Sequence, residues 1–345
     1  MTDAALAFFD SAYETFARAA DAAGVLAVDL CIAGERVRLR FAGPALAPVL
    51  LPALEHLRVP VDPDATVALT VAVFDSATTG VRMPPPPWTA ADYRPKGEIA
   101  GFGTERVHTS FEPGIGVLQT FDAQRRLAVY WVAAPAVVPW WEPTFPFRVL
   151  LHWWCAPTTR QPAHAGAVGR EGRGVLITGP SGSGKSTTAL ACLEAGLDYA
   201  GDDYVLVDVE QLRVYCLYST AKLEPANTDR FPELRALVAN PDRLREEKAI
   251  VYLREHRPDQ LVPELALRAV LVPEVTGRRE SSLAPLAPSA ALQALAPTTT
   301  FHLPGYGREV FAKLSRLVRA VPCHRLLAGT DLSGVAATVD TLVRA

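Results

Sequence analysis

Long uninterrupted hydrophobic runs are missing from this sequence. The longest apolar stretch, from about Leu127 to Trp141, is broken by Pro135 and Pro139, so no segment predicts a membrane-spanning helix. The first residues, Met1-Thr2-Asp3-Ala4, carry none of the positive charge that begins a secretory signal. We therefore expect a soluble, cytoplasmic protein with no membrane partner.

An excess of charge of one sign is also lacking. The 345 residues include 34 Lys and Arg against 37 Asp and Glu, a formal net charge of -3, which gives no general attraction to nucleic acid. Closely paired cysteines are absent as well, because the five cysteines are scattered, odd in number and not at metal-ligand spacing. Buried thiols in a reducing compartment are the expectation, rather than a disulfide framework.

Apolar residues are plentiful, at 49%, which is enough for a sizeable core. Residues 1–144 predict an α+β domain with a helix ending near Gly24 and antiparallel strands further on. A hairpin from Val25 places Arg36, Arg38 and Arg40 on one face, which we interpret as solvated, with an anion-binding or peptide-binding face as the alternative. This domain has no recognisable catalytic constellation. It could serve substrate recognition, packing or dimerisation.

Residues 179–187 read Gly-Pro-Ser-Gly-Ser-Gly-Lys-Ser-Thr, which satisfies the G-x-x-x-x-G-K-[ST] pattern of a phosphate-binding loop, or P-loop. An apolar strand over 174–178 precedes it and a helix over 186–195 follows. Glycines let the backbone N–H groups wrap around phosphates, and the helix N-terminus adds positive charge. We therefore expect ATP and Mg²⁺ as cofactors, with Lys185 on the β- and γ-phosphates and the Ser186 hydroxyl on Mg²⁺. The residues expected to bind the nucleotide are Gly179, Ser181, Gly182, Ser183, Gly184, Lys185, Ser186 and Thr187.

Two adjacent carboxylates, Asp202 and Asp203, follow the P-loop helix and precede an apolar strand over 204–207. One could bind the metal while the other accepts a proton from an attacking hydroxyl, and a simple polar turn is the alternative. Upstream, His164 lies in a segment over 163–168 that we expect to form a hairpin with the P-loop strand. That pairing would place the imidazole near the phosphates. The alternative is a satisfied interior histidine.

The ordered set of His164, the P-loop and the aspartate pair resembles the catalytic core of the HPr serine kinase/phosphorylase family, over about residues 160–210. The resemblance implies an α/β fold over residues 145–345, with a P-loop kinase core related to HPr kinase and phosphoenolpyruvate carboxykinase. It implies that Asp202 is the general base, that His164 tunes or orients it, and that Ser186 and Asp203 hold Mg²⁺. Lys185 is the third residue with a catalytic role.

The overall layout looks more like HPr-kinase-related proteins encoded with ribosomally made peptides, including lasso peptide tailoring kinases, and segments 290–297 and 321–329 suggest this likeness. It implies an ATP-dependent kinase that phosphorylates a serine hydroxyl of a peptide or small protein. The alternatives are an HPr kinase/phosphorylase, a small-molecule kinase on the same core, and a nucleotide-binding regulatory protein without catalysis. Homo-oligomer formation stays open. Candidates for further phosphate or substrate contacts, each with a plain surface charge as its alternative, are Lys222, Lys248, Arg308 and Lys313.

Overall fold

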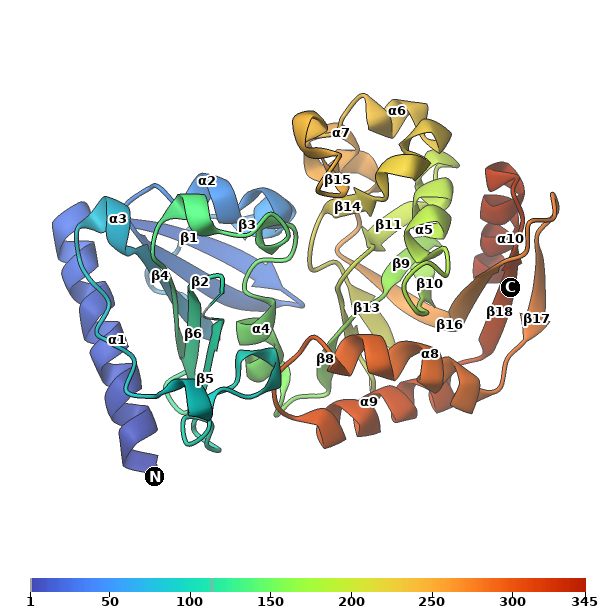
Figure 1. The fold of residues 1–345 in the computed structure, drawn as a ribbon. Coiled ribbons are helices and arrows are strands. Elements are labelled where there is room, and N and C mark those ends of the chain that lie inside the picture. The colour runs from blue at the N-terminus through green and yellow to red at the C-terminus, as the bar shows by residue number, and fades with distance from the viewer. Residues whose placement is uncertain (1, 113) are drawn as a thin grey trace. The chain divides into compact units, whose positions relative to one another are not determined.

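The computed structural model describes residues 2–112 and 114–345, and the chain divides into two units. Unit 1 comprises Met1–Pro157 together with Phe301–Tyr306, and unit 2 comprises Thr158–Thr300 and Gly307–Ala345. Both units combine helices with a mixed sheet, so the chain is of the α/β class (Figure 1). Among the described residues, no helix has both the length and the apolar character needed to span a membrane.

Unit 1 is built around a seven-stranded sheet in the order β3-β1-β2-β4-β7-β6-β5. Its helices and strands are α1 (Thr2–Ala23), β1 (Val25–Ile32), β2 (Glu35–Ala42), α2 (Ala47–Leu50), β3 (Arg58–Val59), β4 (Leu69–Asp75), α3 (Ser76–Thr79), β5 (Val107–Glu112), β6 (Val117–Asp122), β7 (Leu127–Val132) and α4 (Arg148–Cys155). Helix α1 buries Phe8, Phe9 and Phe16 in a core that includes Val129 of the sheet. Because side chains alternate along a strand, Tyr130 faces the other way, where Phe147 meets it edge-on.

The arginine face of the hairpin formed by β1 and β2 was expected to be solvated, but two of its arginines form ion pairs. Its register sets Asp29 opposite Arg38, and the buried Asp29 carboxylate accepts hydrogen bonds at 2.7 Å from both Arg36 and Arg38. The hydrogen bond from Arg38 is the largest of the effects that lower the pKa of Asp29 to about 2. Arg36 and Arg38, both half-buried, therefore form ion pairs with a buried carboxylate, so the prediction of a fully solvated face is wrong for these two residues.

Helix α4 belongs to unit 1, although the second domain was expected to span residues 145–345. Its Trp153 indole N–H donates to the carbonyl of Pro304 at 3.2 Å, and its ring stacks on His108 with 5.5 Å between centroids. The division of the chain therefore falls after Pro157 rather than after residue 144, because this aromatic helix packs inside the first unit.

Unit 2 is built around a nine-stranded sheet. Its helices and strands are β8 (Arg160–Ala163), β9 (Gly166–Arg170), β10 (Arg173–Ile177), α5 (Lys185–Glu194), β11 (Asp198–Gly201), β12 (Val205–Asp208), β13 (Arg213–Tyr215), β14 (Thr220–Leu223), α6 (Pro232–Arg235), β15 (Ala249–Tyr252), α7 (Leu253–His256), β16 (Glu264–Val275), β17 (Ser282–Pro285), α8 (Pro288–Thr300), α9 (Gly307–Ala320), β18 (Cys323–Ala328) and α10 (Leu332–Arg344). The main path is β11-β9-β10-β16-β13-β12-β8, with β18 added beside β16 and β17 beside β18. Strands β14 and β15 form a separate ribbon.

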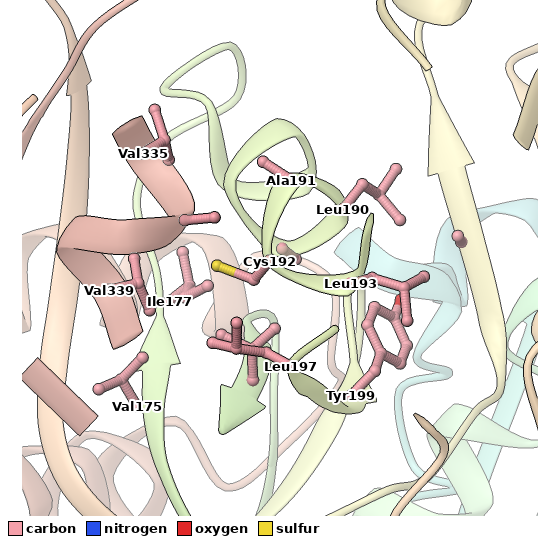
Figure 2. Packing of buried hydrophobic residues seen from close by; sticks show 14 of the residues in the cluster. Val175, Ile177, Leu190, Ala191, Cys192, Leu193, Leu197, Tyr199, Val335 and Val339 are labelled. Atoms are coloured by element: carbon pink, nitrogen blue, oxygen red, sulfur yellow. The ribbon is translucent and has the colours of Figure 1, made fainter. Parts of the chain in front are cut away.

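The core of unit 2 lies where α5 and α10 pack on each other and on the sheet. Cys192 of α5 and Val339 of α10 lie close to Ile177 of β10, and all three are fully buried (Figure 2). The apolar side of α5 is therefore held against the strand that precedes the P-loop, which fixes the direction in which this helix leaves the loop.

Two short loops, called links here, connect the same two pairs of strands: residues 164–165 join β8 to β9, and residues 202–204 join β11 to β12. Strand β8 pairs with β12, and β9 pairs with β11, so the link through His164 and the link through Asp202 and Asp203 both join these pairs. The expected strand over 163–168 is thus broken after residue 163, although β9 does pair antiparallel with β10. The links lie close together, since a Cβ atom on Gly166 would be 3.2 Å from the carbonyl oxygen of Gly201.

Candidate active site

The P-loop connects β10 to α5 in the strand-loop-helix order that the motif predicts. Gly179, Gly182 and Gly184 have φ values of +152°, +78° and +99°, which residues with a Cβ rarely adopt. At Gly179 a Cβ would also lie 2.6 Å from the Ser183 hydroxyl oxygen. The loop is anchored by its neighbour, because the Thr178 N–H donates to the β16 carbonyl of Leu271 at 2.9 Å.

Lys185 begins α5, and its ammonium group is folded back into the loop. It donates to the carbonyl oxygens of Gly179 at 2.9 Å and Pro180 at 3.1 Å, and only 9% of the residue is exposed. Burial lowers the pKa of Lys185, whereas the charges of Asp202 and Asp203 act to raise it. The positive charge is thus held where the loop would surround a phosphate, between the loop backbone and the aspartate pair.

Asp202 lies at the end of β11 and is 2% exposed. Neither oxygen of its carboxyl group has a hydrogen-bond partner of ordinary geometry. Burial, followed by the charge of Asp203, raises the pKa of Asp202 to about 6, while the nearby Ser186 hydroxyl, Lys185 and Lys222 act to lower it. A buried carboxyl that forms no hydrogen bond of ordinary geometry is costly unless something else contacts it, so this group is the strongest pointer to a bound ligand or a moving proton.

Asp203, by contrast, has a charged or polar partner at each of its carboxylate oxygens. One oxygen pairs with His164 Nε2 at 3.0 Å, and the other forms a close ion pair with the ammonium of Lys222 on β14. Burial acts to raise the pKa of Asp203, but Lys222 and His164 outweigh it and hold the pKa far below the usual range. Asp203 therefore stays ionised, which is the form that a cation requires.

His164 lies on Asp203, although the family resemblance implied that it acts on Asp202. The register of β8 and β12 explains this placement. These strands are antiparallel and pair Ala163 with Val205, so His164, which follows Ala163, lies beside the residues that precede Val205. Accordingly, the imidazole stacks on Tyr204 with 5.3 Å between ring centroids. Asp202 lies on the other side of the link, nearer to β9 and the P-loop.

Of the four basic residues proposed as further phosphate or substrate contacts, Lys222 lies in the site and the other three do not. Lys222 is 12% exposed and belongs to the site through Asp203. Lys248 is 42% exposed and pairs with Glu224 at 2.7 Å, Lys313 donates to the Arg160 carbonyl, and Arg308 is exposed. No local pattern set Lys222 apart, because its place in the site comes from a ribbon that is distant in the sequence.

The oxygen ligands present suit Mg²⁺ in kind. Mg²⁺ prefers hydroxyl, carboxylate, phosphate and water oxygens, and it usually takes one or two carboxylates plus substrate phosphates. Ser186 and the aspartate pair offer such a set beside the P-loop. Within residues 2–112 and 114–345, no cluster of three or more His, Cys, Asp or Glu side chains could hold a metal ion by itself. The remaining ligands would therefore have to come from a nucleotide and water.

Other residues of the expected set are placed without specific side-chain contacts. Ser181 and Gly182 are exposed, and the Ser183 hydroxyl is buried without a hydrogen-bond partner. Thr187 follows Ser186 in the first turn of α5 and is half-buried. These residues can offer backbone N–H groups and hydroxyls to phosphate, as the motif requires.

No protein-family model and no curated protein matches the chain. Among solved structures, it is similar to the HPr(Ser) kinase/phosphatase from Coxiella burnetii, with 14% sequence identity, coverage of 53% of this chain and 94% of that chain, and a TM-score of 0.28. Identity and score at this level establish neither a shared family nor a shared activity. Any functional conclusion therefore rests on the residues of the site.

Proposed function

We propose that this protein is an ATP- and Mg²⁺-dependent kinase that transfers the γ-phosphoryl group to a hydroxyl, the serine of a peptide or small protein. The observation that carries the proposal is the Asp202 carboxyl, which is buried beside Lys185, forms no hydrogen bond of ordinary geometry and has the Ser186 hydroxyl as its nearby donor. A polar turn of purely structural use would have satisfied or exposed that group. A nucleotide-binding protein without catalysis could use this carboxyl only as a metal ligand, so the transfer assay below separates the two functions.

The P-loop supplies the binding step in this proposal. Its backbone N–H groups and the N-terminus of α5 would hold the phosphates, and Lys185 would exchange its two carbonyl acceptors for phosphate oxygens. Ser186 and Asp203 would hold Mg²⁺, which neutralises phosphate charge when bound. Catalysis of this kind depends mainly on positioning and charge neutralisation.

Asp202 would act as the general base. The acceptor hydroxyl gives its proton to the carboxylate as its oxygen forms a bond to the γ-phosphorus, and the bond from that phosphorus to the β,γ-bridging oxygen breaks to release ADP. A base works best when its pKa lies near the working pH, and a pKa of about 6 meets that condition. Asp203, held ionised by Lys222 and His164, has a pKa too low for the same task.

The peptide acceptor is the finer part of the proposal. Its support is the likeness to kinases of ribosomally made peptides, such as lasso-type precursors, together with the presence of unit 1. Phosphoryl transfer needs only the P-loop and its acidic neighbours, so a separate unit with its own core is available for recognition of the acceptor.

The test compares Asp202→Asn with wild type in two measurements, binding of ATP and transfer of label from radioactive ATP to serine-containing peptides. We expect ATP affinity within a few-fold of wild type and transfer lowered by about 10²–10⁴-fold, the usual contribution of a general base. Asp198→Asn, on the same strand but outside the site, serves as the matched control. Unchanged transfer by Asp202→Asn contradicts its role as base, and ATP binding by wild type without labelled product from any hydroxyl acceptor contradicts kinase activity.

A further inference from the structure

Unit 1 contains a cavity of about 330 Å³ that the proposed phosphoryl transfer does not use. Its lining comes from α1, the start of α3, the segment over 82–88, and strands β5, β6 and β7, which places it over one face of the seven-stranded sheet. Small-molecule sites usually enclose about 300–1,000 Å³ and are lined by apolar and aromatic groups with a few polar ones. The cavity falls within that range at its lower end, which suits a ligand of one or two rings.

The walls are aromatic and held in place. Trp88 and Phe8 are 8% and 6% exposed and meet edge-on, with 4.8 Å between their ring centroids. Phe111 lies 6.1 Å from Trp88, centroid to centroid, and Trp131 completes the aromatic lining. Because Phe8 and Phe111 both contact Trp88, these rings brace one another, which lowers the cost of ordering them around a flat ligand.

The cavity surface is almost entirely apolar, and Ser76 and Arg82 are the polar side chains in its described lining. The Trp131 indole N–H donates to the Ser76 hydroxyl oxygen at 2.9 Å, so the hydroxyl proton of Ser76 remains available to an acceptor. Arg82 is exposed and is the one charged residue in the described lining. No carboxylate of the described residues forms an ion pair with it.

We propose that this cavity binds a planar aromatic group that carries a carboxylate. The ring would lie among Trp88, Phe111 and Trp131, and the carboxylate would accept hydrogen bonds from the Arg82 guanidinium, which matches a carboxylate with two parallel N–H groups. Aromatic walls by themselves would also accept a cation. Arg82 repels a cation, and that repulsion decides the sign of the ligand charge.

The test uses three probes that differ only in their terminal group: 3-phenylpropionate, 3-phenylpropanamide and 3-phenylpropylamine. All six tryptophans of the chain lie in unit 1, so quenching of tryptophan fluorescence reports binding there. We expect the acid to bind about tenfold or more tighter than the amide, with the amine weakest, because a charge-assisted hydrogen bond is stronger than a neutral one. Arg82→Glu should reverse the order of acid and amine, and exposed Arg126→Glu, outside the cavity, should leave it unchanged.

Two results would overturn the proposal: no binding of any of the three probes, or an order of affinities that Arg82→Glu leaves as in wild type. The ligand could be a free aromatic acid or the last residue of a peptide. N-acetylphenylalanine and a peptide that ends in phenylalanine distinguish these sources, and the same peptide with an amidated end is the control. ATP binding and transfer by Arg82→Glu are measured in parallel, so failure of this cavity and failure of the kinase proposal are separate outcomes.

Discussion

Replacing Asp202 by Asn is expected to stabilise the protein even as it destroys the proposed activity. In the folded protein, burial and the adjacent Asp203 raise the pKa of Asp202 from 3.8 to about 6. A carboxyl with a raised pKa contributes stability that is complete below its unfolded pKa and is lost as the pH rises through its folded pKa. At about 1.4 kcal/mol per pH unit, ionised Asp202 therefore lowers the free energy of unfolding by about 3 kcal/mol above pH 6.

An asparagine amide does not ionise, so the free energy of unfolding of the variant does not fall in this way as the pH rises. Relative to wild type, Asp202→Asn should thus gain about 3 kcal/mol in unfolding free energy between about pH 4 and pH 8. For a unit of this size, that gain raises Tm by roughly 6–12 °C. Asp203→Asn is the matched control with the opposite sign, because Lys222 and His164 outweigh burial and stabilise the ionised form of Asp203.

The measurement is urea unfolding of both variants and wild type at the two pH values. Unit 2 contains no tryptophan, so its unfolding is followed by hydrogen exchange of its amides rather than by fluorescence. A gain by Asp202→Asn that is the same at both pH values would refute the reasoning, because it would mean that the carboxyl is not ionised at a cost in the folded state. A loss that grows with pH would show that the ionised group has partners.

Three further perturbations give distinct expectations. Lys222→Met should lower the unfolding free energy of unit 2 by about 3 kcal/mol, since it leaves Asp203 without its main cation, and Lys222→Arg should restore most of it; hydrogen exchange checks both. Burial raises the pKa of Glu142 to about 7, so the stability of unit 1 should fall by about 3 kcal/mol as the pH rises from 4.5 through 7, and Glu142→Gln should abolish that dependence in tryptophan-monitored unfolding. Asp29→Ala should destabilise unit 1 by about 3 kcal/mol in the same assay, because it leaves two half-buried arginines unpaired.

The sequence by itself determined the local structure of the P-loop. Positive φ angles at Gly179, Gly182 and Gly184 and an apolar strand before them are consequences of neighbouring residues, and the sequence predicted both. The helix that follows was predicted over 186–195 and is found one residue earlier at each end, as α5. The antiparallel strands expected later in residues 1–144 were predicted for the same reason, because a strand-like run and the turn residues that end it, such as Asp122-Ala123, are neighbours in the chain; they are found as β5, β6 and β7.

Only the tertiary structure decided which of the two adjacent aspartates pairs with His164 and Lys222. Asp202 and Asp203 are equivalent as a sequence pattern, yet the pairing of β8 with β12 brings His164 to the second, and the β14 ribbon brings Lys222 to the same one. The partner of Arg36 and Arg38 was hidden in the same way, since a cross-strand neighbour depends on register. The physical reason is common to these cases: backbone conformation follows from residues close in the chain, whereas charge, burial and pKa depend on segments that only the folded sheet brings together.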